Sequence, residues 1–238
     1  MSERISRIRS FLGALALAAM IGLAVLGTNA HAQTSPVATA HDGDASTHYS
    51  YRLISDRSIP SRVELEFDGA GKGSLTLSGN IEHDMQLPIY VKQSTFANLA
   101  PLFDALNFFD SGQIFQAAKE TPKAGLVTIG FKRGSQERRV SFNNTENGVM
   151  VEIRDRLHAI ASQEYRAYLL DRALRDQPET LPDAMRFVAA SITGQEAPDP
   201  ARFVPELRDV AERQQVSPEL RKQAEELIKL IPGESSGK

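Results

Sequence analysis

A glycine-dense segment, Gly69-Ala70-Gly71-Lys72-Gly73-Ser74, invites comparison with phosphate-binding loops. In such a loop a first glycine stands five residues before the Gly-Lys pair, and a hydroxyl residue follows the lysine. Backbone donors then cradle the phosphates and the hydroxyl reaches magnesium. Here Glu66 and Gly73 occupy those two positions. The segment also separates two strand-like stretches, so we expect it to be the turn of a β-hairpin.

Charged side chains cluster in two places and suggest a second kind of chemistry. Glu64, Glu66 and Asp68 occupy alternate positions of one strand-like stretch, where three carboxylates could bind a cation. The alternation is more typical of a solvated strand face opposite an apolar one. Four bases surround a later hairpin: Lys132, Arg133, Arg138 and Arg139. We expect them to pair with the acidic strand across the sheet, and the alternative is a contact for an acidic partner.

The histidines do not predict a metal site. Beyond residue 32 they are His41, His48, His83 and His158. No two of them have the close helical or hairpin spacing of zinc ligands. The best local group, Glu82-His83-Asp84, is typical of a solvated surface histidine.

The serines do not predict a catalytic site either. The Gly-x-Ser-x-Gly match, Gly233 to Gly237, and the Ser-x-x-Lys match, Ser235 to Lys238, both lie at the end of the sequence. The sequence therefore assigns no catalytic, cofactor-binding or metal-ligating residue, and no cofactor is expected. A serine site assembled from distant residues stays an alternative.

Composition narrows the partners and the chemistry. The 238-residue chain has 27 Lys and Arg against 30 Asp and Glu, with no cysteine and no tryptophan. Beyond residue 32 it keeps 24 bases and 29 acids, a formal charge of −5. This mild acidity argues against nucleic acid and against an anionic membrane surface as partners. The lack of cysteine excludes thiol catalysis, thiolate metal sites and disulfides, so burial alone must hold the fold together.

The first 32 residues have the parts of a secretory signal peptide in order. A start with three arginines is followed by residues 11–26, which carry no charge, and by Ala30-His31-Ala32, which fits a signal peptidase. We expect cleavage between Ala32 and Gln33, and a periplasmic or secreted product with no membrane contact. An uncleaved anchor is the alternative, but the apolar run is shorter than the about 20 residues of a spanning helix.

Residues 33–48 are expected to be a disordered linker, because they are polar and have almost no large apolar residue to bury. From residue 49 the pattern predicts an α+β domain, residues 49–160, with an antiparallel sheet. Its strand-like stretches lie near 49–53, 63–67, 75–77, 86–91, 126–132 and 138–142.

Two helices are expected in this domain. Apolar spacing predicts the first over residues 94–109, with a break near Asn98 because Pro101 fits only the first turn of a helix. Asn147-Gly148 is expected to be a turn, and the spacing then predicts a long helix over residues 149–175.

Residues 161–238 are expected to form a helical C-terminal region. Three stretches, residues 181–192, 203–211 and 220–231, share one apolar spacing, and each begins near a proline. Asp199-Pro200 and Ser217-Pro218 each place a capping side chain before a first-turn proline. The helices resemble part of a HEAT-like array, and we prefer an ordinary bundle packed on the first domain.

Four packing segments follow one another between residues 49 and 161: Val63-Glu64-Leu65-Glu66-Phe67-Asp68-Gly69, Leu106-Asn107-Phe108-Phe109, Val127-Thr128-Ile129 and Arg139-Val140-Ser141. In this order they resemble an uncharacterised domain family of secreted bacterial proteins. Members often carry a cysteine pair near the first strands, and this chain has none. The family has no established activity, so the resemblance transfers no site residue.

These features predict an exported, periplasmic, non-enzymatic binding or protein-interaction module, with another envelope protein as its partner. Two alternatives are a periplasmic hydrolase with a dispersed site and a structural envelope protein held by a retained signal anchor. A polar pocket with perturbed titration would favour the hydrolase. An exposed apolar groove on the helices would favour the interaction module.

Overall fold

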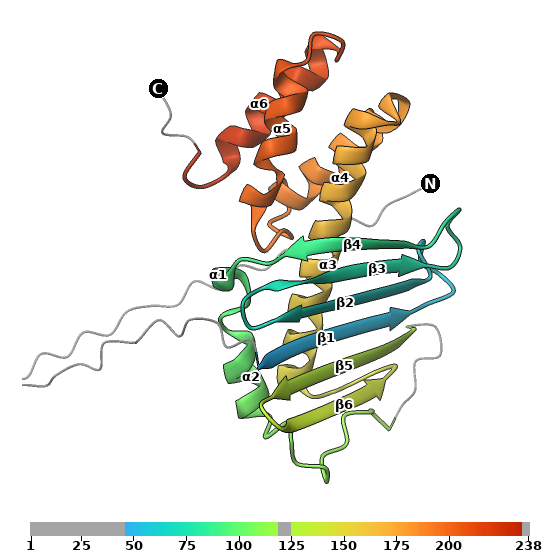
Figure 1. Cartoon of the computed structure of the whole chain (residues 1–238), viewed down its shortest axis with the longest axis vertical. Helices are drawn as coiled ribbons and strands as arrows, with labels where there is room; N and C mark the ends of the chain where they lie inside the picture. The colour runs from blue at the N-terminus through green and yellow to red at the C-terminus, as the bar shows by residue number, and fades with distance from the viewer. Residues whose placement is uncertain (1–45, 119–124, 235–238) are drawn as a thin grey trace, which may run out of the picture. The chain divides into compact units, whose positions relative to one another are not determined.

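The computed structural model describes residues 46–118 and 125–234. These residues form a six-stranded antiparallel sheet, with helices mostly in the C-terminal half, which confirms the expected α+β class (Figure 1). The strand order is β4-β3-β2-β1-β5-β6. The strands are β1 (Thr47–Ile54), β2 (Arg62–Asp68), β3 (Lys72–Ser78), β4 (Met85–Tyr90), β5 (Leu126–Arg133) and β6 (Gln136–Phe142).

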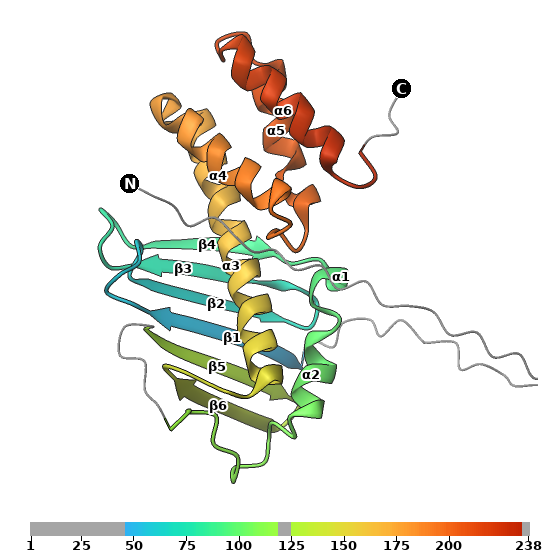
Figure 2. The same cartoon turned by 180° about the vertical axis from the view of Figure 1, so that it is seen from behind.

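Alternating side chains give the sheet one apolar face and one polar face. In β1, for example, Tyr49 and Tyr51 are buried on the apolar face. Helix α3 (Gly148–Arg175) crosses that face, and α2 (Leu99–Ala105) lies on the same side (Figure 2). Among the described helices, none covers the polar face, which is turned to the viewer in Figure 1.

Aromatic rings fill the space between the sheet and the helices. Phe103 of α2 stacks on Phe131 of β5 with ring centroids 4.3 Å apart, and both rings are buried. Tyr49 stacks on Phe67 of the neighbouring strand with centroids 5.0 Å apart. Full burial of such a side chain contributes about 1.5–3 kcal/mol. Ring burial therefore stabilises a fold that has no cysteine.

The two expected hairpins are present, with shifts at the strand ends. β2 pairs with β3 and β5 with β6, both antiparallel, although β6 begins at Gln136, before the expected stretch 138–142. β1 begins at Thr47, so the expected linker over residues 33–48 is wrong at its end; residues 33–45 lie outside the described residues. β4 is an edge strand, where Pro88 is tolerated because proline has no N–H to contribute to a ladder.

The helix expected over residues 94–109 is broken where proline requires it. α1 (Gln93–Phe96) ends before Asn98, and α2 begins directly after Asn98, so Pro101 lies in the first turn of α2. α2 ends earlier than expected. Its chain turns away at Asn107, whose φ of 48° is incompatible with a continuing helix.

The start of α3 corrects another expectation. Asn147 does not form a turn with Gly148; its Oδ1 accepts a hydrogen bond from the Met150 amide at 3.0 Å, and Gly148 is the first helical residue. Asparagine favours turns and caps for the same reason, because its short side chain binds nearby backbone N–H groups in both. The expected domain boundary after residue 160 falls inside α3, whose first half packs on the sheet and whose second half joins a separate helical core.

The remaining described helices follow α3. Ser217 caps the last of them as expected, because its Oγ accepts a hydrogen bond from the Leu220 amide at 3.3 Å. Asp199 does not act as a cap, since its Oδ2 lies 2.9 Å from Nζ of Lys92 and forms an ion pair. α3 packs against α4, and α5 packs against α6. The elements are η1 (Pro178–Thr180), α4 (Leu181–Thr193), η2 (Pro200–Phe203), α5 (Val204–Glu212) and α6 (Pro218–Leu230), where η marks a 3₁₀-helix.

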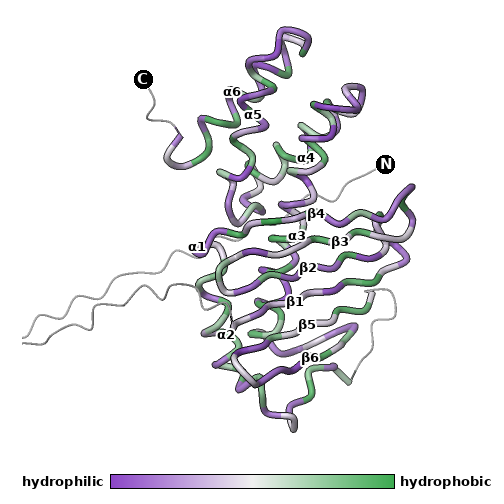
Figure 3. Tube along the Cα trace, in the orientation of Figure 1, coloured by the Kyte–Doolittle hydropathy of each residue, from purple (hydrophilic) through white to green (hydrophobic). Residues whose placement is uncertain are grey.

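Hydropathy follows the faces of these elements, with apolar and polar residues alternating along the sheet and the helices (Figure 3). Within residues 46–118 and 125–234, no helix combines the length and the apolar character that a bilayer crossing requires. The expected signal peptide, residues 1–32, and its cleavage site before Gln33 lie outside the described residues.

Candidate functional site

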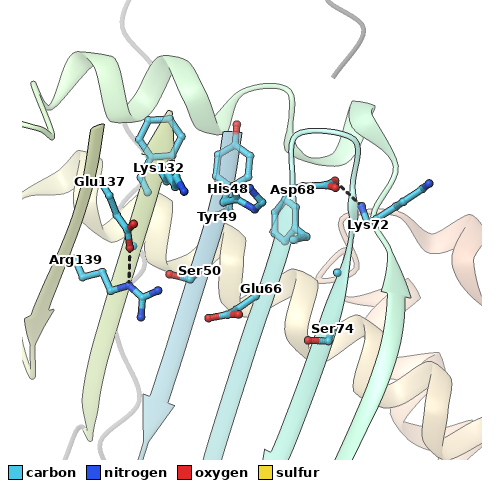
Figure 4. Close-up of a pocket in the computed structure, with 14 residues that line it drawn as sticks. His48, Tyr49, Ser50, Glu66, Asp68, Lys72, Ser74, Lys132, Glu137 and Arg139 are labelled. Atoms are coloured by element: carbon cyan, nitrogen blue, oxygen red, sulfur yellow. Dashed lines mark hydrogen bonds and ion pairs between the residues drawn. The ribbon is translucent and has the colours of Figure 1, made fainter. Parts of the chain in front are cut away.

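The polar face of the sheet carries an open hollow of about 390 Å³, which we call the sheet hollow. Strand register builds it from two adjacent rows of residues that run across the strands. Figure 4 shows side chains of both rows on the same face of the sheet. The first row is Ser74, Glu66, Ser50, Gly130 and Arg139, and the second row is Asp68, His48, Lys132 and Glu137.

Small residues keep the floor of the sheet hollow low. A Cβ atom at Gly130 would lie 2.3 Å from Oγ of Ser50 and 3.0 Å from Cγ of Arg139. Glycine at this position therefore lets the Arg139 side chain lie across β5 towards the centre of the hollow. Nε of Arg139 also pairs with Oε1 of Glu137, 3.4 Å away at the rim (Figure 4).

Opposite charges line the two sides of the sheet hollow without pairing across it. Glu66 and Asp68 belong to β2 and Lys132 belongs to β5, with β1 between them, so their backbones are about 10 Å apart. Within the described residues, no ion pair joins the basic hairpin to the acidic strand, so the expected pairing across the sheet is wrong. The acidic strand instead pairs with β1, where Nε of Arg52 lies 3.1 Å from Oε1 of Glu64.

Two of the four bases of the hairpin lie away from the hollow because strand alternation turns them to the other face. Arg133 pairs with Asp104 of α2, with Nη1 2.8 Å from Oδ1. Arg138 donates hydrogen bonds to the carbonyl oxygens of Phe108, at 2.7 Å, and Gln113, at 2.6 Å. These two arginines hold the segment after α2 against the sheet and are structural.

The glycine-dense segment contains the predicted hairpin turn at Gly69-Ala70-Gly71, but Lys72, Gly73 and Ser74 already belong to β3. The Asp68 carboxylate accepts hydrogen bonds from the amides of Ala70 and Lys72, each at 2.9 Å. Gly71 has a φ of 84°, and a Cβ atom there would lie 2.0 Å from the carbonyl oxygen of Val91. Backbone crowding therefore accounts for Gly71 without a phosphate ligand.

A second candidate surface lies among the helices and encloses about 570 Å³; we call it the helical groove. It opens between the end of α3, the start of α4 and the α5–α6 connection. Its polar lining is Arg175, Arg213, Gln215 and Ser217, with no acidic side chain. Its apolar lining is Ala173, Leu174, Pro178, Leu181, Pro182, Val216 and Leu220.

The two arginines of the helical groove already have partners, and Arg213, which follows α5, also donates a hydrogen bond to the carbonyl oxygen of Leu174 in α3. Arg175 pairs with Asp171, and Nη2 of Arg213 lies 2.7 Å from Oδ2 of Asp209. A guanidinium carries five N–H donors, so each arginine keeps donors for a further acceptor. The groove thus combines apolar walls with cationic donors at its rim.

Tyr51, His158 and Ser162 form a hydrogen-bonded chain where the sheet meets α3. The Tyr51 hydroxyl lies 3.0 Å from Nδ1 of His158, and Nε2 of His158 lies 3.4 Å from Oγ of Ser162. Burial lowers the pKa of His158 and so favours the neutral ring, although the charge of Asp155 acts in the opposite direction. This is the order found in nucleophilic catalysis, with Ser162 in the position of the nucleophile, His158 in that of the base and Tyr51 in that of the orienting residue.

The surroundings of these three hydrogen-bonded side chains do not suit catalysis. Ser162 lies in the interior of α3, where nearby backbone amides donate to helix carbonyls and leave no oxyanion hole. Neither the sheet hollow nor the helical groove is lined by Ser162 or His158. His158 therefore serves to satisfy the hydroxyl of the buried Tyr51.

A buried ion pair joins α3 to the C-terminal helices. Glu164 is 5% exposed, and Nε of Arg202 lies 3.1 Å from its Oε2. Burial raises the pKa of Glu164, and the charge of Arg202 opposes this effect. Arg202 also pairs with Glu206 at 3.0 Å, so one guanidinium serves two carboxylates.

The histidines considered as metal ligands stay apart. His83 contacts Glu82 at 3.8 Å on an exposed loop, and His48 lies in the sheet hollow. In the described part of the chain, no group of three or more His, Cys, Asp or Glu side chains is placed to hold a metal ion. His41, Ser235 and Lys238 lie outside the described residues.

Known proteins add no assignment to either surface. No protein-family model matches the chain, and no curated protein matches it at a significant level. The resemblance of residues 49–161 to secreted bacterial proteins therefore stays a prediction. The charged residues of the sheet hollow are visible one by one in the sequence, but the helical groove is not, because α3, α4 and α6 contribute to it from distant parts of the chain.

Proposed function

We propose that this chain is an exported, non-enzymatic module that binds another protein of the cell envelope. The observation that carries the proposal is the helical groove, an open hollow with mostly apolar walls, in which Pro178 and Pro182 are exposed and Leu220 is half-buried. Exposed apolar grooves between helices commonly receive apolar side chains of a partner. Its volume of about 570 Å³ suits a few such side chains.

The chemistry of the groove indicates which partner segment fits it. Apolar walls favour an apolar anchor, and the rim offers Arg175 and Arg213 but no acidic side chain. An acidic residue beside the anchor would accept charge-assisted hydrogen bonds from these arginines. The occupant is therefore a partner segment that carries an apolar anchor followed or preceded by Asp or Glu.

The hydrolase alternative has weaker support. It depends on the chain from Tyr51 through His158 to Ser162, which lacks an oxyanion hole and lies outside both candidate surfaces. A substrate panel that is turned over by the wild-type protein but not by Ser162→Ala would favour the hydrolase.

A matched pair of proline variants tests the groove. Pro182 and Pro205 are both exposed residues in the first turn of a helix, but only Pro182 lines the groove. Both sites tolerate glutamate, because a carboxylate is favourable at a helix N-terminus. We expect immobilised wild-type protein and Pro205→Glu to retain the same partner from envelope extract, and Pro182→Glu to lose it, as read by mass spectrometry. Equal retention by both variants, or no retained partner, would contradict the proposal.

Export has its own test, which is the mass of the protein recovered from cells. The proposal expects a periplasmic chain that begins at Gln33, because Ala30-His31-Ala32 directs cleavage there. A membrane-bound product that keeps residues 1–32 would instead favour the retained anchor. A full-length product in the cytoplasm would overturn export.

A further inference from the structure

The sheet hollow is separate from the helical groove, and the proposed partner contact makes no use of it. Its charges are arranged as a dipole. Glu66 lies on one side, beside Asp68, whose carboxylate is held by the turn amides of Ala70 and Lys72. Lys132 and Arg139 lie on the other side, where Glu137 pairs with Arg139, and Ser50 and Gly130 form the floor between the two sides. Figure 4 shows Ser50 between Arg139 and Glu66.

The fold explains why the acidic and basic side chains of the hollow form no ion pair with each other. Strand β1 holds the acidic and basic strands about 10 Å apart. In the part of the chain that the structure describes, Glu66 and Lys132 take part in no ion pair, and Arg139 pairs only with Glu137 on its own strand. Charges of opposite sign therefore face each other across a floor of small residues.

A simple ion does not match this arrangement. An anion attracted by Lys132 and Arg139 is repelled by Glu66 and Asp68, and a cation meets the reverse. A ligand with an ammonium group at one end and a carboxylate at the other gains a charge-assisted hydrogen bond at each end. The hydroxyl of Ser50, which lies next to Glu66 in the same row, is placed to bind a polar group between those ends.

The spacing of the row selects the length of the ligand. From Glu66 to Gly130 the row crosses two strand intervals, about 10 Å. Three extended peptide residues also span about 10 Å. We propose that the sheet hollow binds a short zwitterionic peptide of about three residues, with its ammonium group at Glu66 and its carboxylate at Arg139.

The test uses tri-alanine as the probe and the purified protein in a titration followed by amide NMR shifts of Ser50 and Gly130. We expect saturable binding of tri-alanine and none of its N-acetylated, C-amidated form, because capping removes both charges. Glu66→Gln and Arg139→Gln should each weaken binding about tenfold. Both side chains are exposed, so these variants keep the fold.

Glu64→Gln and Arg52→Gln are the matched controls. Arg52 of β1 and Glu64 of β2 also lie on the polar face of the sheet and pair with each other, but neither lines the sheet hollow. We expect both to bind tri-alanine with wild-type affinity. The proposal is overturned by absent saturation, by equal binding of the capped peptide, or by equal loss in the Glu66→Gln and Glu64→Gln variants. None of these results bears on the helical groove, so failure here leaves the proposed function standing.

Discussion

Tyr51 is 3% exposed, so its hydroxyl needs a partner inside the fold. His158 supplies that partner with a neutral imidazole nitrogen, and in doing so it joins β1 to α3. The charged groups that act on the ring are Asp155, which favours the protonated form, and Arg154 and Arg166, which disfavour it; burial is the largest effect and lowers the pKa of His158. Protonation of this ring should therefore be coupled to unfolding.

The coupling predicts a pH dependence of stability with a definite sign. The folded-state pKa of His158 lies below its unfolded value of about 6.5. Between those two values the unfolded chain binds a proton that the folded chain does not, so the free energy of unfolding decreases as pH falls below about 6.5. In urea denaturation, the free energy of unfolding of His158→Gln should therefore fall less, as pH decreases below about 6.5, than that of the wild-type protein. A variant with the same slope as the wild-type protein over that range would refute the assignment.

Arg202 is a second residue on which distant segments depend. Removing its charge in Arg202→Met leaves Glu164 buried and without its cation, which costs about 3–5 kcal/mol of unfolding free energy. Arg186→Met is the control, because its pair with Asp183 is exposed on both sides and contributes less than about 1 kcal/mol. Chemical denaturation measures the free energy of unfolding of both variants, and a similar loss in both would mean that the buried ion pair stabilises the fold no more than an exposed one.

At the scale of elements, the hairpin turns offer a matched test of backbone crowding. Gly71 and Gly134 both have positive φ, at 84° and 58°. A Cβ at Gly71 meets the Val91 carbonyl oxygen, whereas a Cβ at Gly134 meets nothing within 4 Å. Gly134→Ala should cost only the strain of its backbone, about 1–2 kcal/mol. Gly71→Ala should cost clearly more in thermal denaturation, and equal costs would contradict this account.

The strands and helices could largely be predicted because their signals are local. Alternation in residues 63–67 identifies the strand and its buried face, and Pro101 fixes where the first helix must break. The pairing of β1 with β5 could not be predicted, since these strands lie far apart in the sequence. Asp199 shows the same limit: its sequence context predicts a cap, but a lysine 107 residues away takes its carboxylate.

For the whole molecule, sequence predicts which residues are charged but not how they face one another. The bases at Lys132 and Arg139 and the acids at Glu66 and Asp68 are plain in the sequence. Only the strand order shows that β1 keeps them apart and leaves the sheet hollow between them. The helical groove escapes sequence analysis for a related reason, since Leu181 and Leu220 read as ordinary positions on helix faces until the helices are packed.

The central claim is that the helical groove receives a partner protein of the envelope. The most direct measurement is photo-cross-linking in intact cells, with a photoreactive phenylalanine analogue at position 182 or at position 205. The account predicts a cross-link to one envelope protein from position 182, which lines the groove, and none to that protein from position 205. Cross-links of equal yield from both positions, or none from position 182, would contradict it.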